Sequence, residues 1–119
     1  MIGFEDKTQR RRKHQRLPIV ALCDISAPDT GKILGKGCIL NYSRGGLAIA
    51  SPANLAWDAP VNLTVDGLDQ EGFIAAKVVN VRPVIDGLNS YGLEFVGLNP
   101  LQKIQVERRF KKLFESRLS

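Results

Sequence analysis

The order of apolar and polar residues in the middle of the chain predicts short β-strands. Val61, Leu63 and Val65 alternate with polar residues, which is the pattern of a strand with one buried face. Similar short apolar runs recur along the chain, each bounded by Gly, Pro, Asn, Asp or Ser. The segments that we predict as strands are residues 17–26, 36–40, 46–50, 61–65, 73–81 and 91–96.

Turn-forming residues separate these segments. The predicted turns and loops are residues 27–31, 41–46, 51–60, 66–70 and 85–90. Trp57 lies in the third of these, where it is either a core or loop anchor or a residue that stacks on a ligand. Because closing a sheet removes exposed strand edges, so many short strands in one small chain favour a small antiparallel barrel.

The end of the chain changes to a helical period. Asn99 is a good helix N-cap residue, with Pro100 at the first helical position. One apolar stripe at helical spacing follows: Val106, Phe110, Leu113, Phe114 and Leu118. Four basic residues lie largely outside the stripe: Arg108, Arg109, Lys111 and Lys112. We predict an amphipathic helix over about residues 100–118, whose basic face is either a solvated surface or a docking surface.

Length and charge narrow the class of protein. The 119 residues suffice for one domain with a modest core, and a hydrophobic content of 44% is typical of a globular chain. The net charge of +5 is uneven, since residues 7–16 hold six basic and no acidic side chains and residues 103–117 hold six basic and two acidic. This distribution predicts an anionic partner. We expect residues 1–9, which are polar and aperiodic, to be a flexible tail.

The sequence predicts neither membrane insertion nor export. No apolar run reaches the roughly 18–20 residues of a bilayer span, so we expect a cytoplasmic protein. Cys23 and Cys38 are equidistant from a predicted turn near residues 30–31, and they are either free thiols or a disulfide across a hairpin. Their spacing gives no metal signature, and His14 is the only histidine.

Two short motifs carry the candidate chemistry. Arg12 and Arg16 form Arg-x-x-x-Arg in a basic leader before the first strand. Their planar, permanently charged donors fit phosphate oxygens and the O6/N7 edge of guanine. Asn41, Ser43 and Gly46 form Asn-x-Ser-x-x-Gly in a turn, whose glycines allow a flat ligand to approach the backbone. Together the motifs predict a site for a small guanine-containing phosphate ligand.

Antiparallel geometry predicts that the two motifs converge. The leader precedes the first strand, and the turn follows the second strand, so both lie at the same end of the pair. Taken alone, a basic leader also fits a solvated tail or a non-specific polyanion contact. Asn, Ser and Gly are common in any turn. The order and spacing of both motifs are more specific than either motif by itself.

In these two motifs the chain resembles the PilZ domain family, the bacterial receptor module for the second messenger cyclic di-GMP. The family signature is Arg-x-x-x-Arg followed by Asp/Asn-x-Ser-x-x-Gly, and the resemblance covers about residues 10–118. It implies a single all-β domain: a six-stranded antiparallel split barrel, about residues 17–98, with one C-terminal amphipathic α-helix. It also implies a leader that stays mobile until ligand arrives, which fits its unpaired like charges.

The resemblance implies that seven residues bind the ligand: Arg11, Arg12, Arg16, Asn41, Ser43, Gly45 and Gly46. Arg12 and Arg16 would clamp the guanine edge and the phosphates. In the family, an arginine at the position of Arg11 accompanies a stacked, intercalated pair of ligand molecules. Arg44 either assists or faces solvent, and His14 either contacts the ligand or is an exposed spacer.

The turn residues have implied roles of their own. Asn41 would contact a guanine edge with one acceptor oxygen, where the family more often has an aspartate with two. Ser43 would make one hydrogen bond to base or phosphate. Gly46, together with Gly45, would allow the ligand close to the backbone.

No constellation of catalytic residues is present, so we expect a non-enzymatic receptor with no cofactor or metal. The implied partners are cyclic di-GMP and an unidentified downstream protein, with output in motility or biofilm regulation and no specific nucleic acid. Two alternatives stay open. One is a PilZ-fold protein–protein interaction module without ligand. The other is a small basic barrel that binds single-stranded nucleic acid, which requires stacking aromatics on its strands.

Overall fold

The middle of the chain, where apolar and polar residues alternate, folds into six antiparallel strands. The end of the chain, where apolar residues recur at helical spacing, folds into one helix. The computed structural model describes residues 21–69 and 72–118. The elements in this part of the chain are β1 (Leu22–Ser26), β2 (Ile33–Tyr42), β3 (Gly46–Ser51), β4 (Pro60–Val65), β5 (Ile74–Ile85), β6 (Leu88–Phe95) and α1 (Pro100–Leu118). The predicted tail and the arginine leader lie outside the described residues.

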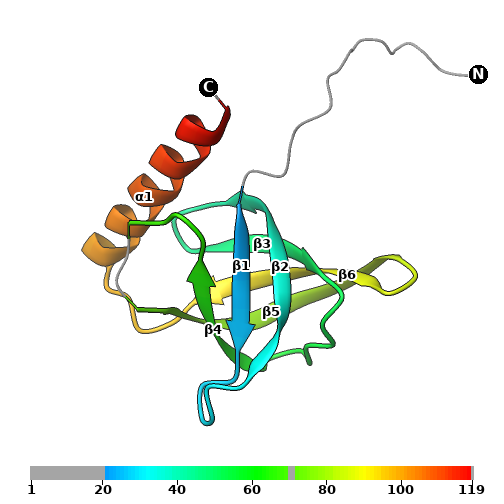
Figure 1. The fold of residues 1–119 in the computed structure, drawn as a ribbon. Coiled ribbons are helices and arrows are strands. Elements are labelled where there is room, and N and C mark those ends of the chain that lie inside the picture. Colours follow the sequence, from blue (N-terminus) through cyan, green and yellow to red (C-terminus); the bar gives the residue numbers. More distant parts are fainter. Residues whose placement is uncertain (1–20, 70–71, 119) are drawn as a thin grey trace, which may run out of the picture.

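The six strands close into a barrel in the order β1-β2-β3-β6-β5-β4 (Figure 1). Every neighbouring pair is antiparallel, and the barrel is closed by β1 and β4, where Cys23 pairs with Val65. Closure provides each strand with two neighbours, so backbone hydrogen bonds are satisfied without a free sheet edge through the barrel. The predicted six-stranded antiparallel barrel with one C-terminal helix is confirmed.

The barrel interior is filled by the inward-facing side chains of the strands and by one face of α1. In β1, Cys23 and Ile25 are buried, whereas Leu22, the first residue of the strand, is exposed. The largest fully buried side chains include Tyr91, Phe110, Ile25, Ile49, Leu63, Val61 and Val78. Burial of this continuous apolar cluster is the main stabilising contribution to the fold.

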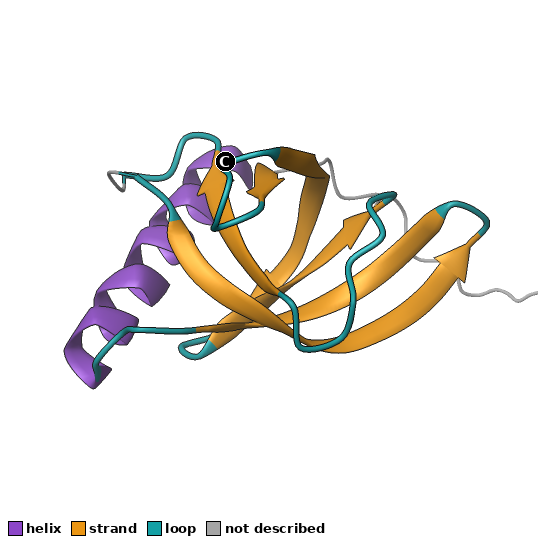
Figure 2. Cartoon of the chain, turned by 90° about the horizontal axis from the view of Figure 1, so that it is seen from below, coloured by secondary structure: helices purple, strands orange, loops and turns teal. Residues whose placement is uncertain are grey.

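Helix α1 begins where the sequence predicts and packs against one end of the barrel (Figures 1 and 2). The Asn99 side chain accepts a hydrogen bond from the Gln102 N–H at 2.8 Å, and the Gln102 side chain accepts one from the Asn99 N–H at 2.9 Å. This reciprocal capping fixes the first turn. Phe110 is fully buried, with its ring centroid 6.3 Å from that of Phe95 and 5.7 Å from that of Tyr42.

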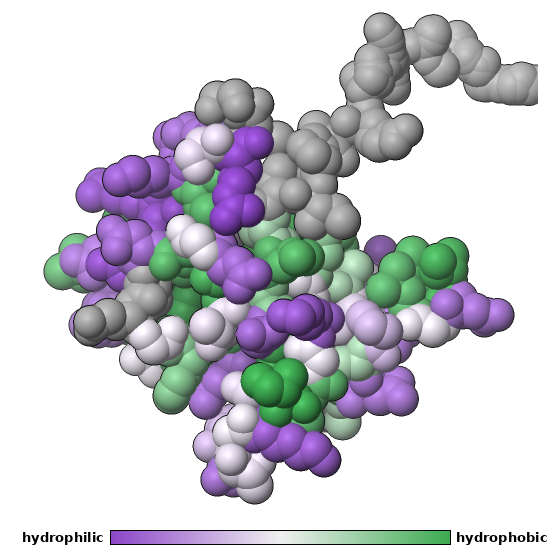
Figure 3. All heavy atoms as spheres, in the orientation of Figure 1, coloured by the Kyte–Doolittle hydropathy of each residue, from purple (hydrophilic) through white to green (hydrophobic). Residues whose placement is uncertain are grey.

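The turn predicted over residues 85–90 is present but shorter than predicted. Asp86 and Gly87 alone form the turn, with Gly87 at φ +78°, and β5 and β6 continue outward to it as a two-stranded ribbon (Figure 1). Beyond the barrel wall both faces of the ribbon meet solvent, so its sequence lacks the alternation that marks a half-buried strand. Val84 and Ile85 are exposed at its tip, where apolar side chains gather (Figure 3).

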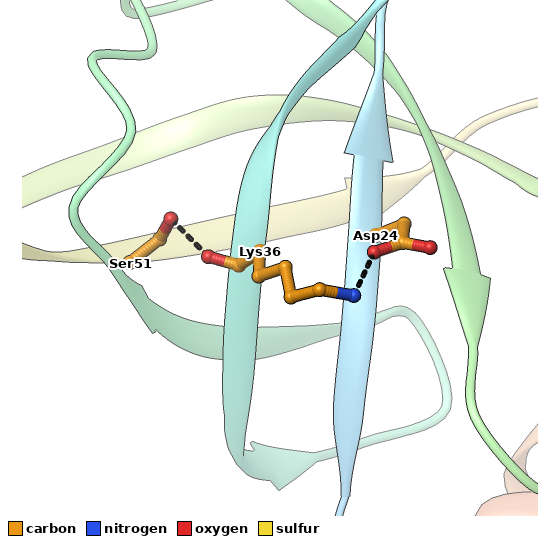
Figure 4. Close-up of polar contacts among 3 residues, drawn as sticks. All are labelled: Asp24, Lys36 and Ser51. Atoms are coloured by element: carbon orange, nitrogen blue, oxygen red, sulfur yellow. Dashed lines mark hydrogen bonds and ion pairs between the residues drawn. The ribbon is translucent and has the colours of Figure 1, made fainter.

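Polar contacts hold the loop that leaves β3. The Ser51 hydroxyl donates a hydrogen bond to the Lys36 carbonyl at 2.5 Å (Figure 4). The ammonium group of the same Lys36 lies 2.6 Å from the Asp24 carboxylate and so joins β2 to β1. Farther along the loop, the buried Tyr91 hydroxyl donates to the Ala53 carbonyl and accepts from the backbone N–H of residue 55 at 3.1 Å. These bonds satisfy backbone groups that have no strand partner.

The two cysteines are free thiols, and the disulfide alternative is wrong. Cys23 pairs with Gly37, and Cys38 pairs with Leu22, so the two cysteines are one residue out of register. Because successive side chains in a strand point to opposite faces, Cys23 is buried inside the barrel while Cys38 lies on its outer face.

Candidate functional site

The turn between β2 and β3 brings four of the predicted site residues together: Asn41, Ser43, Gly45 and Gly46. β2 ends at Tyr42 and β3 begins at Gly46. The Ser43 N–H donates a hydrogen bond to the Gly46 carbonyl at 2.8 Å, and the Ser43 hydroxyl donates to the same oxygen at 3.4 Å. The turn backbone is therefore fixed, while the side chains of Asn41 and Ser43 remain exposed.

An open pocket of about 440 Å³ lies beside this turn on the outer face of the barrel. Its lining residues are Asn41, Ser43, Gly45, Gly46, Leu47, Ala48, Val79, Gly92, Leu93 and Glu94. Asn41 pairs with Ala48, and Ala48 pairs with Gly92, so one row of the sheet crosses the pocket. Because Ala48 and Gly92 carry a methyl group and a hydrogen, the floor formed by this row is flat.

The groups around this floor suit a flat ligand with polar edges. Asn41 carries an amide, Ser43 a hydroxyl and Glu94 a carboxylate, which lies 3.9 Å from the Lys77 ammonium. A flat apolar floor contacts the face of a ring, and polar groups around it bond to the ring's edge. The pocket can therefore accept a heteroaromatic ring that lies on the sheet.

Gly46 is required by the barrel itself. A Cβ atom on Gly46 would lie 2.0 Å from the Leu93 carbonyl oxygen, so β3 and β6 can pair here only if residue 46 is glycine. The neighbouring Gly45 carbonyl accepts a hydrogen bond from the Phe95 N–H at 2.9 Å, yet a Cβ atom on Gly45 would meet nothing within 4 Å. The close backbone approach predicted for Gly46 is thus made to β6, and the open space is at Gly45.

Arg44 points away from the pocket, toward the helix. Its Nε atom lies 3.1 Å from Glu107 Oε1 of α1, and both side chains remain partly exposed to solvent. The Arg44 side chain is 63% exposed, and its predicted assistance in ligand binding stays a prediction. The remaining predicted residues, Arg11, Arg12, His14 and Arg16, lie outside the described residues, so the convergence of leader and turn stays a prediction.

Tyr42, between Asn41 and Ser43, also faces the helix. Its ring centroid lies 5.7 Å from that of Phe110 and 5.2 Å from that of Phe114. Desolvation raises the pKa of the Tyr42 hydroxyl, and the carboxylates of Glu115 and Glu107 raise it further. Tyr42 therefore remains neutral at physiological pH and anchors the end of β2 on α1.

The sequence analysis missed the part of the pocket that other strands contribute. Val79 lies in a β-bulge, because Val78 pairs with Leu93 while Asn80 pairs with Gly92, and the bulge leaves Val79 exposed at the pocket. A glycine inside a strand, such as Gly92, is the sequence signal that marks close approach of another group. Nothing in the local sequence marks the bulge.

A second pocket, of about 420 Å³, borders the basic face of α1. It is lined by Gly67, Asp69, Gln105, Arg108, Arg109, Lys112, Leu113 and Ser116. Three cations and one carboxylate therefore surround a concave surface. Trp57 lines neither pocket and is 70% exposed in the loop between β3 and β4, so it is not a core residue, and its predicted roles as a loop anchor or a ligand stacker stay predictions.

Within residues 21–69 and 72–118, no three His, Cys, Asp or Glu side chains gather in a way that could hold a metal ion. In the same part of the chain, no helix has the length and hydrophobicity of a bilayer span.

Known proteins resemble this chain in sequence, over a range that includes the arginine leader, and in the fold of the barrel. The family model for the PilZ domain matches residues 10–112. The fold is similar to the PilZ domain of YcgR from Escherichia coli, solved with c-di-GMP, at a TM-score of 0.55 and 18% identity over 81% of this chain and 82% of that one.

A second solved structure has the same fold. It is that of K. pneumonia MrkH in its apo state, with a TM-score of 0.59 and 20% identity over 91% of this chain and 52% of MrkH. The chain therefore corresponds to about half of MrkH. No curated protein matches the sequence.

Proposed function

The chain belongs to the PilZ domain family, and on this premise we propose that it is a non-enzymatic receptor for cyclic di-GMP. The observation that carries the proposal is the open pocket beside the β2–β3 turn, whose lining includes Asn41, Ser43 and Gly46, the three fixed residues of the family's second motif. This ligand, c-di-GMP, is present in the structure of the similar PilZ domain of YcgR, and it has flat bases and anionic phosphates.

Each group of the turn has a definite part in the proposed binding. A guanine ring lies on the floor formed by Ala48 and Gly92, with the Asn41 amide at its edge. The exposed Ser43 hydroxyl bonds to base or phosphate, and the open space at Gly45 admits the ligand close to the backbone.

The leader supplies the charge in this proposal. Arg12 and Arg16 clamp the phosphates and the O6/N7 edge of guanine with paired donors. Arg11 contributes to an intercalated pair of ligand molecules. Binding neutralises the positive leader and so changes the surface that a downstream protein meets in the bacterial cytoplasm.

The aromatic residues favour this proposal over binding of single-stranded nucleic acid. Stacking on a strand surface requires exposed aromatic rings. In the described strands, Tyr91 and Phe95 are buried in the barrel and Tyr42 packs on the helix. The described strands therefore offer no aromatic platform for a chain of bases.

Isothermal titration with cyclic di-GMP tests the proposal. We expect binding with a Kd in about the micromolar range or tighter, which weakens as salt is raised because phosphate contacts are ionic. Arg16→Ala and Ser43→Ala each remove a polar contact and weaken binding, by about tenfold or more for the charged arginine contact. Ser43→Ala should fold, since Ser43 is exposed and its hydroxyl makes only a long bond at 3.4 Å.

Matched controls are Arg82→Ala and Ser90→Ala. Neither residue lines the pocket, and Arg82 is exposed on the β5–β6 ribbon. Unchanged affinity in both controls separates contact with the ligand from a general loss of charge or hydroxyl groups. Absence of binding by the intact protein would favour the ligand-free interaction module, and tight binding of oligonucleotides at moderate salt would favour the nucleic-acid alternative.

A further inference from the structure

The segment from Asn41 to Gly45 presents alternate side chains to two different parts of the molecule. Asn41, Ser43 and Gly45 line the pocket. Tyr42 and Arg44, which lie between them, contact α1. Asn41 and Tyr42 lie at the end of β2, where successive side chains point in opposite directions, and Ser43, Arg44 and Gly45 belong to the turn that follows. One short segment therefore joins the pocket directly to the helix.

The two contacts with the helix differ in strength. Tyr42 packs on Phe110, which is fully buried, and on Phe114. Arg44 instead forms an ion pair with Glu107 at 3.1 Å, with 63% of the arginine side chain and 32% of the glutamate side chain exposed. Exposed ion pairs are weak because water screens both charges. The ion pair can therefore break while the aromatic contact holds the helix in place.

A phosphate in the pocket is a strong competitor for Arg44. Both neighbours of Arg44 in the chain, Ser43 and Gly45, line the pocket, and among the described residues Glu107 is the carboxylate that pairs with its guanidinium. A phosphate diester offers two oxygens to the planar guanidinium, and bonds between two charged groups are the stronger ones.

We propose that Arg44 exchanges Glu107 for a phosphate of the bound ligand, so that occupancy of the pocket is coupled to the charge presented by α1. This inference rests on the proposed binding of cyclic di-GMP. In the free protein, Glu107 holds Arg44 out of the pocket and competes with the ligand. In the bound protein, Glu107 is released and adds an unpaired carboxylate to the exposed surface of the helix.

A double-mutant cycle on cyclic di-GMP affinity tests the exchange. Arg44→Gln removes the phosphate contact and should raise Kd by about tenfold. Glu107→Gln removes the competitor and should lower Kd by about two- to fivefold, which is the range of an exposed ion pair. In the Arg44→Gln background, Glu107→Gln should have no further effect, because the competition no longer exists.

Glu115→Gln is the matched control. It removes the same charge from an exposed position of the same helix, and no ion pair joins Glu115 to Arg44. A fall in Kd for Glu107→Gln that exceeds the fall for Glu115→Gln shows specific competition. Equal effects of the two substitutions, or a higher Kd for Glu107→Gln, overturn the inference.

A second readout follows the helix directly. The NMR signal of the Glu107 carboxyl carbon should move when cyclic di-GMP is added to the intact protein. In Arg44→Gln, the signal should already lie at the released position and should not move further. Tight binding without movement of this signal overturns the exchange and leaves the receptor proposal intact, whereas failure of the intact protein to bind overturns both.

Discussion

At the level of single residues, the adjacent Gly45 and Gly46 differ in the space around them. Both line the pocket, but only Gly46 lies against another strand, with the Leu93 carbonyl oxygen 2.0 Å from where its Cβ would be. Gly45 has open space at the same position. The glycine at the end of the second motif is therefore explained by pairing of β3 with β6, whereas the space at Gly45 would also accept a methyl group.

Gly46→Ala should lower the free energy of unfolding by about 3 kcal/mol, because the methyl group forces β3 and β6 apart. Urea denaturation followed by circular dichroism measures the change. Gly45→Ala is the control and should stay within about 0.5 kcal/mol of the original protein. Equal stability of the two variants would contradict this explanation of Gly46.

At the scale of elements, α1 is part of the barrel core. Phe110 is fully buried between the rings of Tyr42 and Phe95, so the helix closes one end of the barrel with an aromatic side chain. The helix start is fixed locally by Asn99 and Gln102. Local capping sets where the helix begins, and packing of its apolar stripe sets where it lies.

Phe110→Ala should cost about 3–5 kcal/mol of unfolding free energy, since it leaves a cavity at the end of the barrel. The milder Phe110→Leu, expected to cost about 1 kcal/mol, keeps the measurement possible if the alanine variant does not fold. Leu101→Ala, at a helix position that is 63% exposed, should change stability by less than about 0.5 kcal/mol. Similar losses at positions 101 and 110 would show that α1 does not pack as described.

At the scale of the whole molecule, closure of the barrel creates a dry interior that affects ionisation. The pKa of the Cys23 thiol is raised from 9.0 to about 11. Burial is the main cause, a backbone hydrogen bond with Gly37 opposes it, and the charges of Asp24, Asp66 and Cys38 add to the rise. The folded state therefore favours the protonated thiol more strongly than the unfolded state does. This contribution is complete below about pH 9 and is lost as pH rises toward 11.

Stability of the intact protein should therefore fall between about pH 9 and pH 11, with up to about 2 kcal/mol of the loss due to Cys23. Urea denaturation across this range measures it. Cys23→Ala should be less stable at neutral pH, because of the cavity, but should show a shallower dependence on pH. Cys38→Ala should keep the original slope, and identical slopes for all three proteins would rule out the buried thiol as the cause.

The features that depend on neighbouring residues can be predicted from the sequence. Alternation of apolar and polar residues gave the six strands, Asn99 and Pro100 gave the start of the helix, and the turn residues from Asn41 to Gly46 gave the connection beside the pocket. Capping, turn formation and one-sided burial each depend on a few neighbouring residues, so a short stretch of sequence is enough to predict them. The two motifs also carried the resemblance to the PilZ family.

The folded structure is needed to show which distant residues meet. It placed Gly92 and the bulged Val79 in the pocket, put the Leu93 carbonyl against Gly46, and paired Arg44 with Glu107 on the helix. These contacts depend on β3 and β5 both becoming neighbours of β6 and on the register of those pairs. The register of the strands is fixed by the burial of apolar side chains inside the barrel. Because all six strands contribute to the free energy of this burial, no single segment of sequence specifies the register.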